Sequence, residues 1–246
     1  MYIFDIKMFS KKLNQVSLYF YKILLRALIF FLVYVILMCK SIAENSPANL
    51  TVLGDRTSHI VWIYLCGLTE TINSPQEMHN RKILDAIGRE LNLTVIAVPP
   101  SERCFEFSNK LCWLQDTYKQ RQATLAYIHQ KIHPNRVSGF IGFSNGGFFL
   151  NQLAQEQSLN VPIISIGSAG PYIPDPVQNE LYLIIGRHDR YHYHHAIRFY
   201  QAMTNTQLNV HLIEINSDHE IVKAPLKNLL HSLISKKSKD DESINC

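Results

Sequence analysis

Short apolar runs alternate with helix-like segments along most of the chain. The runs are rich in β-branched and aromatic residues and nearly continuous in apolar character, which is typical of strands buried on both faces. The predicted central strands are His59–Leu65, Leu93–Val98, Val137–Phe143, Ile163–Ile166, Leu181–Ile185 and Val210–Ile215. A further run, Leu50–Leu53, is expected to form an edge strand.

Between these runs, apolar residues recur at intervals of three and four, as they do on one face of an amphipathic helix. The predicted helices are Pro75–Leu91, Thr117–Ile132, Asn145–Gln157, Tyr191–Met203 and Ile221–Ile234. This alternation predicts an α/β fold, with a mostly parallel sheet covered by helices on both faces. Ligands bind beyond the carboxyl ends of the strands in such a sheet, so we expect the functional residues directly after the runs.

One segment departs from the alternation. Between Ile166 and Leu181 the chain contains three prolines and no large insertion. Because proline opposes a long helix, we expect no large lid domain over the functional edge of the sheet.

Residues 1–43 have the parts of a secretory signal. A basic region precedes the uncharged apolar stretch Ala27–Met38, and Ser41 and Ala43 are small residues of the kind that a signal peptidase reads. The stretch is shorter than the roughly 20 residues that span a bilayer. We therefore expect a cleaved signal peptide and a periplasmic or secreted protein. The alternative is a membrane anchor formed by residues 23–39, in which case only this segment would contact a membrane.

The rest of the chain is expected to form one domain, residues 44–235, and a polar, frayed tail, residues 236–246. Hydrophobic residues make up 47% of the chain and charged residues 18%, which is a globular composition. The formal charge is +4, but residues 1–43 hold six Lys or Arg residues and one acid. The remainder is close to neutral, so we expect no nucleic acid among the partners.

Export would permit disulfide bonds. Four cysteines remain after the predicted cleavage site, and two of them, Cys104 and Cys112, lie close together in a segment that we interpret as a loop. We expect these two to pair, with two free thiols as the alternative. Cys66 ends an apolar run and is interpreted as a small buried hydrophobic residue.

The strongest chemical signal lies between a predicted strand and a predicted helix, where the chain reads Gly142-Phe143-Ser144-Asn145-Gly146. This is the G-x-S-x-G pattern in the strand, turn and helix context of a nucleophile elbow. A turn this tight strains the backbone at Ser144 and brings its neighbours close together, which favours glycine at Gly142 and Gly146. The alternative is an ordinary strand-to-helix loop. The flanking elements favour Ser144 as a nucleophile at a helix N-terminus.

A serine hydroxyl needs a base to take its proton. Asp189 follows the run Leu181–Ile185, and His219 follows the run Val210–Ile215, so the chain supplies serine, acid and histidine in the required order. We expect Asp189 to orient His219, and His219 to deprotonate Ser144. Asp218 is the alternative acid, but it adjoins His219, and neighbours in a tight loop seldom point at each other.

Four further histidines lie close together, His188, His192, His194 and His195. They could be interpreted as a metal site. No cysteine or convincing carboxylate set accompanies them, so we interpret them as an exposed polar rim and expect no metal or cofactor.

An oxyanion hole needs two backbone N–H groups. One is expected from Asn145, directly after the nucleophile. The other is expected from Leu68, in the loop after the first central strand, where Gly67 gives the backbone room. The alternative for Gly67 is a plain turn glycine.

These residues resemble those of the α/β-hydrolase superfamily, over about 58–234. The Ser-Asn-Gly-Gly sequence at Ser144 is similar to that of small esterases related to polyhydroxybutyrate depolymerases, feruloyl esterases and the phospholipase/carboxylesterase group. The Gly-Arg-His-Asp sequence that ends at Asp189 is similar to their acid loop. The resemblance implies a three-layer α/β-hydrolase fold, and hydrolysis of esters or thioesters through an acyl-enzyme without a cofactor.

Two segments qualify the resemblance. Many members carry His-Gly in the oxyanion loop, where this chain has Cys66 and Gly67. The segment Pro99–Asp116 resembles the loop that shapes the pocket in these families. Its aromatic residues, among them Phe107 and Trp113, could receive an acyl or aryl group, or they could be surface packing beside the cysteine pair.

The sequence thus predicts an exported serine esterase that acts on a small-molecule or lipid-like ester. One alternative is an acyltransferase or peptidase with the same triad, although acyl transfer to an alcohol would need a site that excludes water. Another is a catalytically silent binding protein that keeps the fold. The presence of all three triad residue types argues against the silent protein.

Overall fold

The computed structural model describes residues 50–100, 102–113, 118–156, 159–170, 180–205 and 209–244. The predicted leader, residues 1–43, lies outside the described residues, as do residues 171–179 of the proline-containing segment on which the prediction of no large lid depends. Within the described ranges, no helix has both the length and the apolar character needed to cross a membrane.

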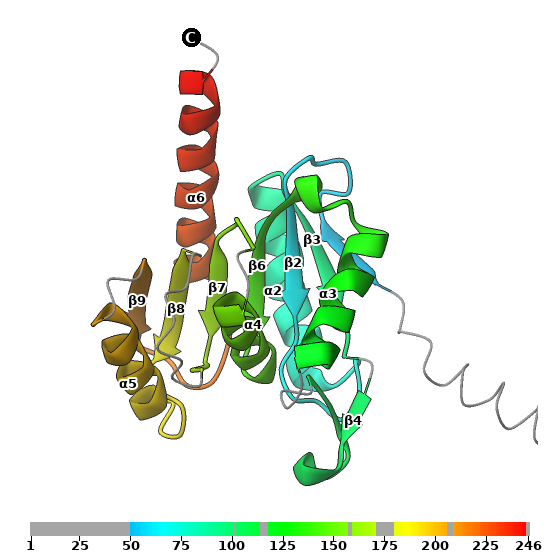
Figure 1. The fold of residues 1–246 in the computed structure, drawn as a ribbon, viewed down its shortest axis with the longest axis vertical. Coiled ribbons are helices and arrows are strands. Elements are labelled where there is room, and N and C mark those ends of the chain that lie inside the picture. The colour runs from blue at the N-terminus through cyan, green and yellow to red at the C-terminus, as the bar shows by residue number, and fades with distance from the viewer. Residues whose placement is uncertain are drawn as a thin grey trace, which may run out of the picture. The chain divides into compact units, whose positions relative to one another are not determined.

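The centre of the fold is a mostly parallel sheet with the strand order β1-β3-β2-β6-β7-β8-β9 (Figure 1). Its strands are β1 (Thr51–Gly54), β2 (Val61–Leu65), β3 (Thr94–Val98), β6 (Val137–Phe143), β7 (Ile163–Ile166), β8 (Leu181–Gly186) and β9 (Val210–Ile215). Only β1 runs antiparallel to its neighbour, and it lies at the sheet edge, as predicted. The switch in strand order between β2 and β3 on one side and β6 to β9 on the other places the ends of β2 and β6 side by side at the centre.

Helices cover both faces of this sheet, which gives three layers. Helices α3 (Tyr118–Lys131), α4 (Asn145–Glu156) and α5 (Tyr193–Thr204) lie on one face, and α2 (Pro75–Glu90) and α6 (Lys223–Ile244) lie on the other (Figure 1). On each face of the sheet, an apolar core lies between the strands and the helices that cover them. The first core includes Phe149 and Leu150 of α4, and the second includes Leu84 of α2 and Leu230 of α6.

The strand β2 shows why the apolar runs are continuous. Its side chains alternate between the two cores, since Ile63 and Leu65 belong to one and Trp62 and Tyr64 to the other. All of them are buried, and burial of a side chain of this size contributes roughly 1.5–3 kcal/mol. A polar residue on either face of such a strand would lose that contribution, so both faces select apolar residues.

The C-terminal part differs from the prediction. The last helix was predicted to end at Ile234, ahead of a frayed tail at residues 236–246, whereas α6 continues as far as Ile244. The extension contains no proline or glycine, and its lysine and glutamate residues are good helix formers. Lys236 also donates to a carboxylate oxygen of Glu180 across 3.2 Å, which ties the start of the extension to the sheet.

The segment that was predicted as a loop around the two cysteines is a short hairpin. Its strands are β4 (Glu102–Cys104) and β5 (Lys110–Cys112), which pair in antiparallel register on either side of a 3-10 turn at Phe105–Phe107. Strands of three residues are too short to show an alternating pattern in the sequence. The Sγ atoms of Cys104 and Cys112 lie at disulfide distance, and the two Cα atoms are 5.9 Å apart, which suits such a bond.

Candidate active site

Ser144 lies at the tight turn between β6 and α4, and its backbone is strained. Its φ angle is +52°, in the left-handed region that non-glycine residues rarely occupy. The turn is held from both sides, because Ser144 N–H donates to the carbonyl of Ile166 at 2.8 Å and Phe148 N–H donates to the carbonyl of Ser144 at 3.0 Å. Such strain at a strand-to-helix turn is the property of a nucleophile elbow.

The elbow glycines are required by close backbone contacts. A Cβ atom on Gly142 would lie 2.6 Å from the Cα atom of Gly147 in the first turn of α4. A Cβ atom on Gly146 would overlap the carbonyl groups of Leu65 and Cys66 at the end of β2. The second contact also shows that α4 begins directly against the loop that follows β2.

Asp189 and His219 meet beyond the carboxyl ends of β8 and β9. His219 Nδ1 lies 2.6 Å from Asp189 Oδ2. The two loops are tied together by their backbones, since Arg187 N–H donates to the carbonyl of Ile215 at 2.8 Å and His188 N–H donates to that of Ser217 at 3.0 Å. The carboxylate that contacts His219 is therefore that of Asp189, the expected acid, and not that of its neighbour Asp218.

The environment keeps this pair ready for proton transfer. Burial would raise the pKa of Asp189, but hydrogen bonds from His192 and His219 hold that pKa below its ordinary value, so the carboxylate stays ionised. Burial lowers the pKa of His219, and the neighbouring His192 lowers it further, against the opposing effect of Asp189. His219 is thus a neutral imidazole, able to accept a proton, at neutral pH.

His219 lies beside the elbow but does not contact the serine hydroxyl directly. Within the described residues, no hydrogen bond joins Ser144 Oγ to His219. The imidazole packs against the ring of Phe143, the residue before Ser144, with the ring centroids 4.9 Å apart. It also lies against Gly167, where a Cβ atom would come within 2.9 Å of Nδ1. Hydrogen bonds of this kind are often long without substrate and shorten in the reacting complex.

The predicted oxyanion loop lies against Ser144. A Cβ atom on Gly67 would be 3.1 Å from the Cβ atom of Ser144, and Leu68 and Asn145 line the same cavity as Ser144. The structure therefore brings together the two residues whose N–H groups were predicted to form the oxyanion hole.

The hairpin around the cysteine pair supports this loop. Thr69 and Leu111 exchange backbone hydrogen bonds of 3.1 and 2.7 Å. Trp113 makes two further contacts: its Nε1–H donates to the carbonyl of Cys66 at 2.8 Å, and its backbone N–H donates to Asn145 Oδ1 at 2.7 Å. One residue of the hairpin thus joins the oxyanion loop to the first residue of α4. This contact could not be expected from the spacing of the residues.

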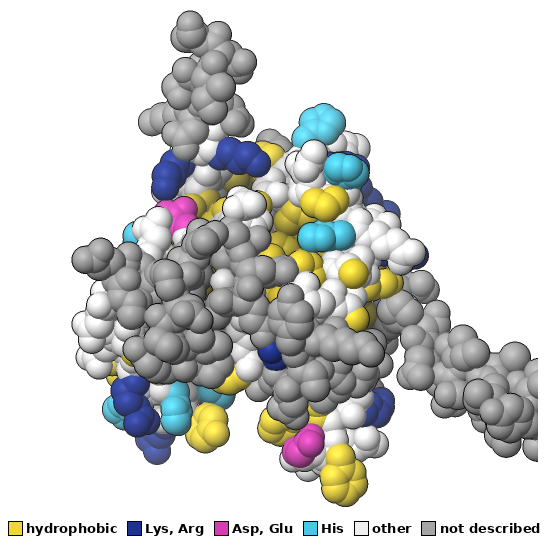
Figure 2. All heavy atoms as spheres, in the orientation of Figure 1, with side chains coloured by type: hydrophobic (Ala, Val, Ile, Leu, Met, Phe, Trp, Pro, Cys, Tyr) yellow, Lys and Arg dark blue, Asp and Glu magenta, His cyan; other side chains and the backbone are white. Residues whose placement is uncertain are grey.

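A cavity of about 750 Å³ opens above Ser144. Its apolar walls come from the oxyanion loop, the hairpin and two helices, namely from Leu68, Phe107, Phe148 and Phe199. Tyr191, which is 74% exposed, forms part of its rim. Figure 2 shows hydrophobic and histidine side chains gathered at the lower edge of the molecule, where Figure 1 places α5 and the hairpin. Of the predicted pocket aromatics, Phe107 lines this cavity, whereas Trp113 is buried and is not among the lining residues.

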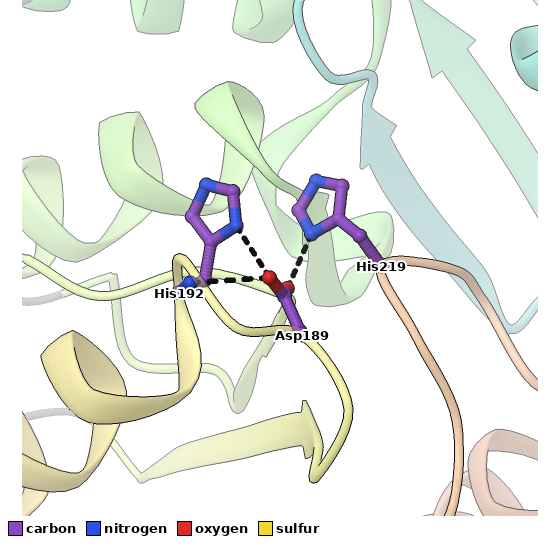
Figure 3. Close-up of side chains that lie close together, drawn as sticks. All are labelled: Asp189, His192 and His219. Carbon is purple, nitrogen blue, oxygen red and sulfur yellow. Dashed lines mark hydrogen bonds and ion pairs between the residues drawn. The ribbon is translucent and has the colours of Figure 1, made fainter.

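His192 was interpreted as part of an exposed rim, and for this residue the interpretation is wrong. Its side chain is 30% exposed, and its Nδ1 lies 2.9 Å from Asp189 Oδ1 (Figure 3). The ring stacks on that of His219 with the centroids 4.2 Å apart and the planes 17° from parallel. The sequence offered one sign of the His192–Asp189 contact, namely that His192 follows Asp189 by three residues at the start of a predicted helix. The other three histidines of the cluster lie in the same segment, so this sign did not distinguish His192 from them.

Asp189, His192 and His219 are also the one group of metal-ligand type that the described residues bring together. Their arrangement suits hydrogen bonding better than chelation. The two rings are nearly parallel, so their nitrogen lone pairs run side by side and do not converge on one point. Both Nδ1 atoms already face the carboxylate of Asp189.

No protein-family model matches the chain, and a comparison with curated protein sequences finds no match either. Solved structures do match it. A carboxylesterase from Mesorhizobium loti superposes with a TM-score of 0.59 at 13% identity, over 76% of this chain and 93% of the carboxylesterase. Zea mays acyl-protein thioesterase 2 gives a TM-score of 0.53 at 17% identity, over 75% of this chain and 98% of the thioesterase. Esterase PE8 gives a TM-score of 0.53 at 14% identity, over 76% of this chain and 97% of the esterase.

The chain has the α/β-hydrolase fold. The three-layer architecture and the mostly parallel sheet predicted from the sequence are confirmed. At these identities the likeness establishes the fold and not the reaction.

Proposed function

We propose that this protein is an exported serine hydrolase that cleaves carboxylic esters through an acyl-enzyme intermediate. The observation that carries the proposal is the Asp189–His219 hydrogen bond of 2.6 Å beside a strained serine at a nucleophile elbow. Carboxylesterases and an acyl-protein thioesterase among the structural neighbours support the same class of reaction.

The proposed reaction follows from these positions. Ser144 Oγ attacks the carbonyl carbon of the ester while its proton passes to His219 Nε2, and Asp189 stabilises the imidazolium that forms. The carbonyl oxygen becomes an oxyanion and accepts hydrogen bonds from the backbone N–H groups of Leu68 and Asn145. His219 then returns the proton to the alcohol oxygen as the carbon–oxygen bond breaks. A water molecule, deprotonated by His219, hydrolyses the acyl-enzyme and restores Ser144.

The cavity supports an ester with an apolar acyl or aryl group. The described residues that line it include no carboxylate, and its volume of about 750 Å³ exceeds the space that a short acyl group fills. Tyr191 of the cavity lining is 74% exposed. Access of water to the acyl-enzyme at this side chain would favour hydrolysis over transfer to a second alcohol.

The experiment is a series of chromogenic esters of increasing acyl length, with kcat and KM measured for the wild type and for Ser144→Ala. We expect KM to fall as the acyl chain lengthens, and the Ser144→Ala variant to lose turnover on every ester. Turnover that survives in Ser144→Ala would reject the nucleophile. A wild type without turnover on any ester or thioester would favour the silent binding protein.

Export is proposed separately, from the leader and from the cysteine pair at disulfide distance. The test is N-terminal sequencing of the protein recovered from the periplasm or the medium. A new N-terminus directly after Ala43 is expected. An intact leader in the membrane fraction would favour the anchor formed by residues 23–39.

A further inference from the structure

Two imidazoles share one carboxylate in this site. Asp189 Oδ2 contacts Nδ1 of His219, and Asp189 Oδ1 accepts from both the backbone N–H and the ring Nδ1 of His192, at 3.1 and 2.9 Å. Both rings stand on the same side of the carboxylate, and their second nitrogens point away from it (Figure 3). The serine mechanism described above uses only one of these rings.

The His192 contacts restrict how the carboxylate can turn. Asp189 is buried, with 5% of its surface exposed, and Oδ1 is held by two donors of the same residue. Rotation of the carboxylate away from His219 would break both hydrogen bonds. Hydrogen bonds to a charged group are stronger than those between neutral groups, so the present rotamer is preferred.

The stacked ring also restricts His219. The imidazole of His219 stacks on the ring of His192, at 4.2 Å, and also contacts the ring of Phe143, at 4.9 Å. Because Asp189 fixes Nδ1 and a stacked ring covers one face, rotation of the imidazole would break both the hydrogen bond and the stack. Tyr191 packs edge-on against His192 at 4.8 Å and so supports the stack from the rim of the cavity.

We propose that His192 is a positioning residue of the active site, which fixes Asp189 through its two N–H donors and holds the His219 ring in the orientation needed to reach Ser144. The role rests on the proposed serine-hydrolase function. It requires His192 to be neutral with its proton on Nδ1. A second positive charge stacked on His219 would oppose the imidazolium that forms when Ser144 loses its proton, and a single carboxylate faces both rings.

Among the described residues, three titratable groups contact His192: Asp189 from the loop after β8, His219 from the loop after β9, and the adjacent Tyr191. His195, which contacts Tyr191, and Arg198 line the same cavity as His192. In a variant without the His192 ring, His219 would be less buried and, at low pH, would lack a positively charged neighbour. Both changes raise the pKa of His219 toward its ordinary value.

Two variants separate the contributions of the donor and the ring. His192→Asn places an amide N–H where Nδ1 lies and removes the ring, whereas His192→Phe keeps the ring and removes the donor. His194→Phe is the matched control, because His194 is an exposed histidine on the same helix outside the cavity lining. Kinetics on a chromogenic ester and melting temperatures are measured for the wild type and these three variants, and kinetics also for His192→Ala and His219→Ala.

For His192→Phe we expect kcat to fall roughly 10- to 100-fold, the loss of one hydrogen bond to a charged group, with KM little changed. His192→Asn should keep most of kcat, and the acid limb of its kcat/KM profile should move to higher pH. His194→Phe should match the wild type. A merely structural role would lower the melting temperature of both His192 variants without moving the acid limb, and that result would overturn the proposal. A loss in His192→Ala as complete as in His219→Ala would overturn it too, because His192 would then be the base.

A measurement on the unmodified protein keeps this inference independent of the reaction. Imidazole ¹H–¹⁵N spectra report the tautomer of each histidine and the pKa of His219, whether or not an ester is hydrolysed. We expect His192 to carry its proton on Nδ1 at neutral pH. A proton on Nε2 alone would overturn the positioning role, whereas an Nδ1 proton in a protein without Ser144-dependent turnover would reject only the proposed function.

Discussion

Asp189 and His219 lie thirty residues apart in the chain, and their side chains are joined by a hydrogen bond of 2.6 Å. The contact is made by two loops that leave adjacent parallel strands at the same edge of the sheet. Parallel strands bring their carboxyl ends together, so residues far apart in sequence meet there. The remaining partner, Ser144, leaves the same edge after β6, and Phe143, the residue before it, packs against the ring of His219.

Removal of the His219 imidazole should abolish turnover. We expect kcat of His219→Ala to fall by roughly 10⁴-fold or more, because the serine would have no base and the leaving group no acid. His194→Ala, at an exposed position, should keep the wild-type value. Single-turnover kinetics would check the loss, and a kcat within tenfold of the wild type would exclude His219 as the base.

The pH dependence of activity should reflect the lowered pKa of His219. The base acts only when it is unprotonated, so kcat/KM should be constant near neutral pH and fall as the pH drops through that pKa. Since burial lowers the pKa of His219, the fall should lie below about 6.5, the ordinary value for histidine. A kcat/KM profile that falls above this value would contradict the surroundings assigned to the imidazole.

Loss of the Cys104–Cys112 pair should affect both stability and rate. In a Cys104→Ser, Cys112→Ser variant we expect the free energy of unfolding to fall by roughly 2–3 kcal/mol, as for a short closed loop. We also expect a lower kcat, because the same hairpin holds the oxyanion loop through Thr69 and Trp113. Urea unfolding and kinetics measure the two effects.

Alkylation without prior reduction, followed by peptide mass spectrometry, gives the control for this prediction, because it distinguishes Cys104 and Cys112 from the other cysteines that follow the leader, Cys66 and Cys246. Alkylated Cys104 and Cys112 in the unreduced wild-type protein would mean that the two cysteines are not bonded. If the double variant unfolds at a lower urea concentration but keeps the wild-type kcat, the hairpin contributes to stability only, and the predicted effect on the rate is wrong.

The sequence was most informative where one local pattern determines the geometry. The elbow is specified by Ser144 and its flanking glycines within a strand and a helix, and the structure reproduces the turn with a φ of +52°. The contact between Asp189 and His219 could be predicted because each residue comes directly after a buried apolar run, and parallel strands bring such positions to the same edge of the sheet. Neither inference needed knowledge of side-chain packing.

The features that were missed depend on contacts between distant segments. The β4–β5 hairpin is stabilised by its bridge to Thr69 and by the burial of Trp113, neither of which leaves a periodic pattern. His192 was one of four clustered histidines, and its contact with Asp189 depends on the backbone conformation at the start of α5. Sequence patterns specify which residues follow a strand, whereas the direction of a side chain within a loop depends on the folded backbone.

We propose that Ser144 is a nucleophile activated by His219 and Asp189. Labelling of the folded protein with a fluorophosphonate probe, followed by peptide mass spectrometry, tests this directly. We expect one modified residue, Ser144, in the wild type, no label in Ser144→Ala, and much slower labelling in His219→Ala. An unlabelled wild type, or label that persists in Ser144→Ala, would contradict it.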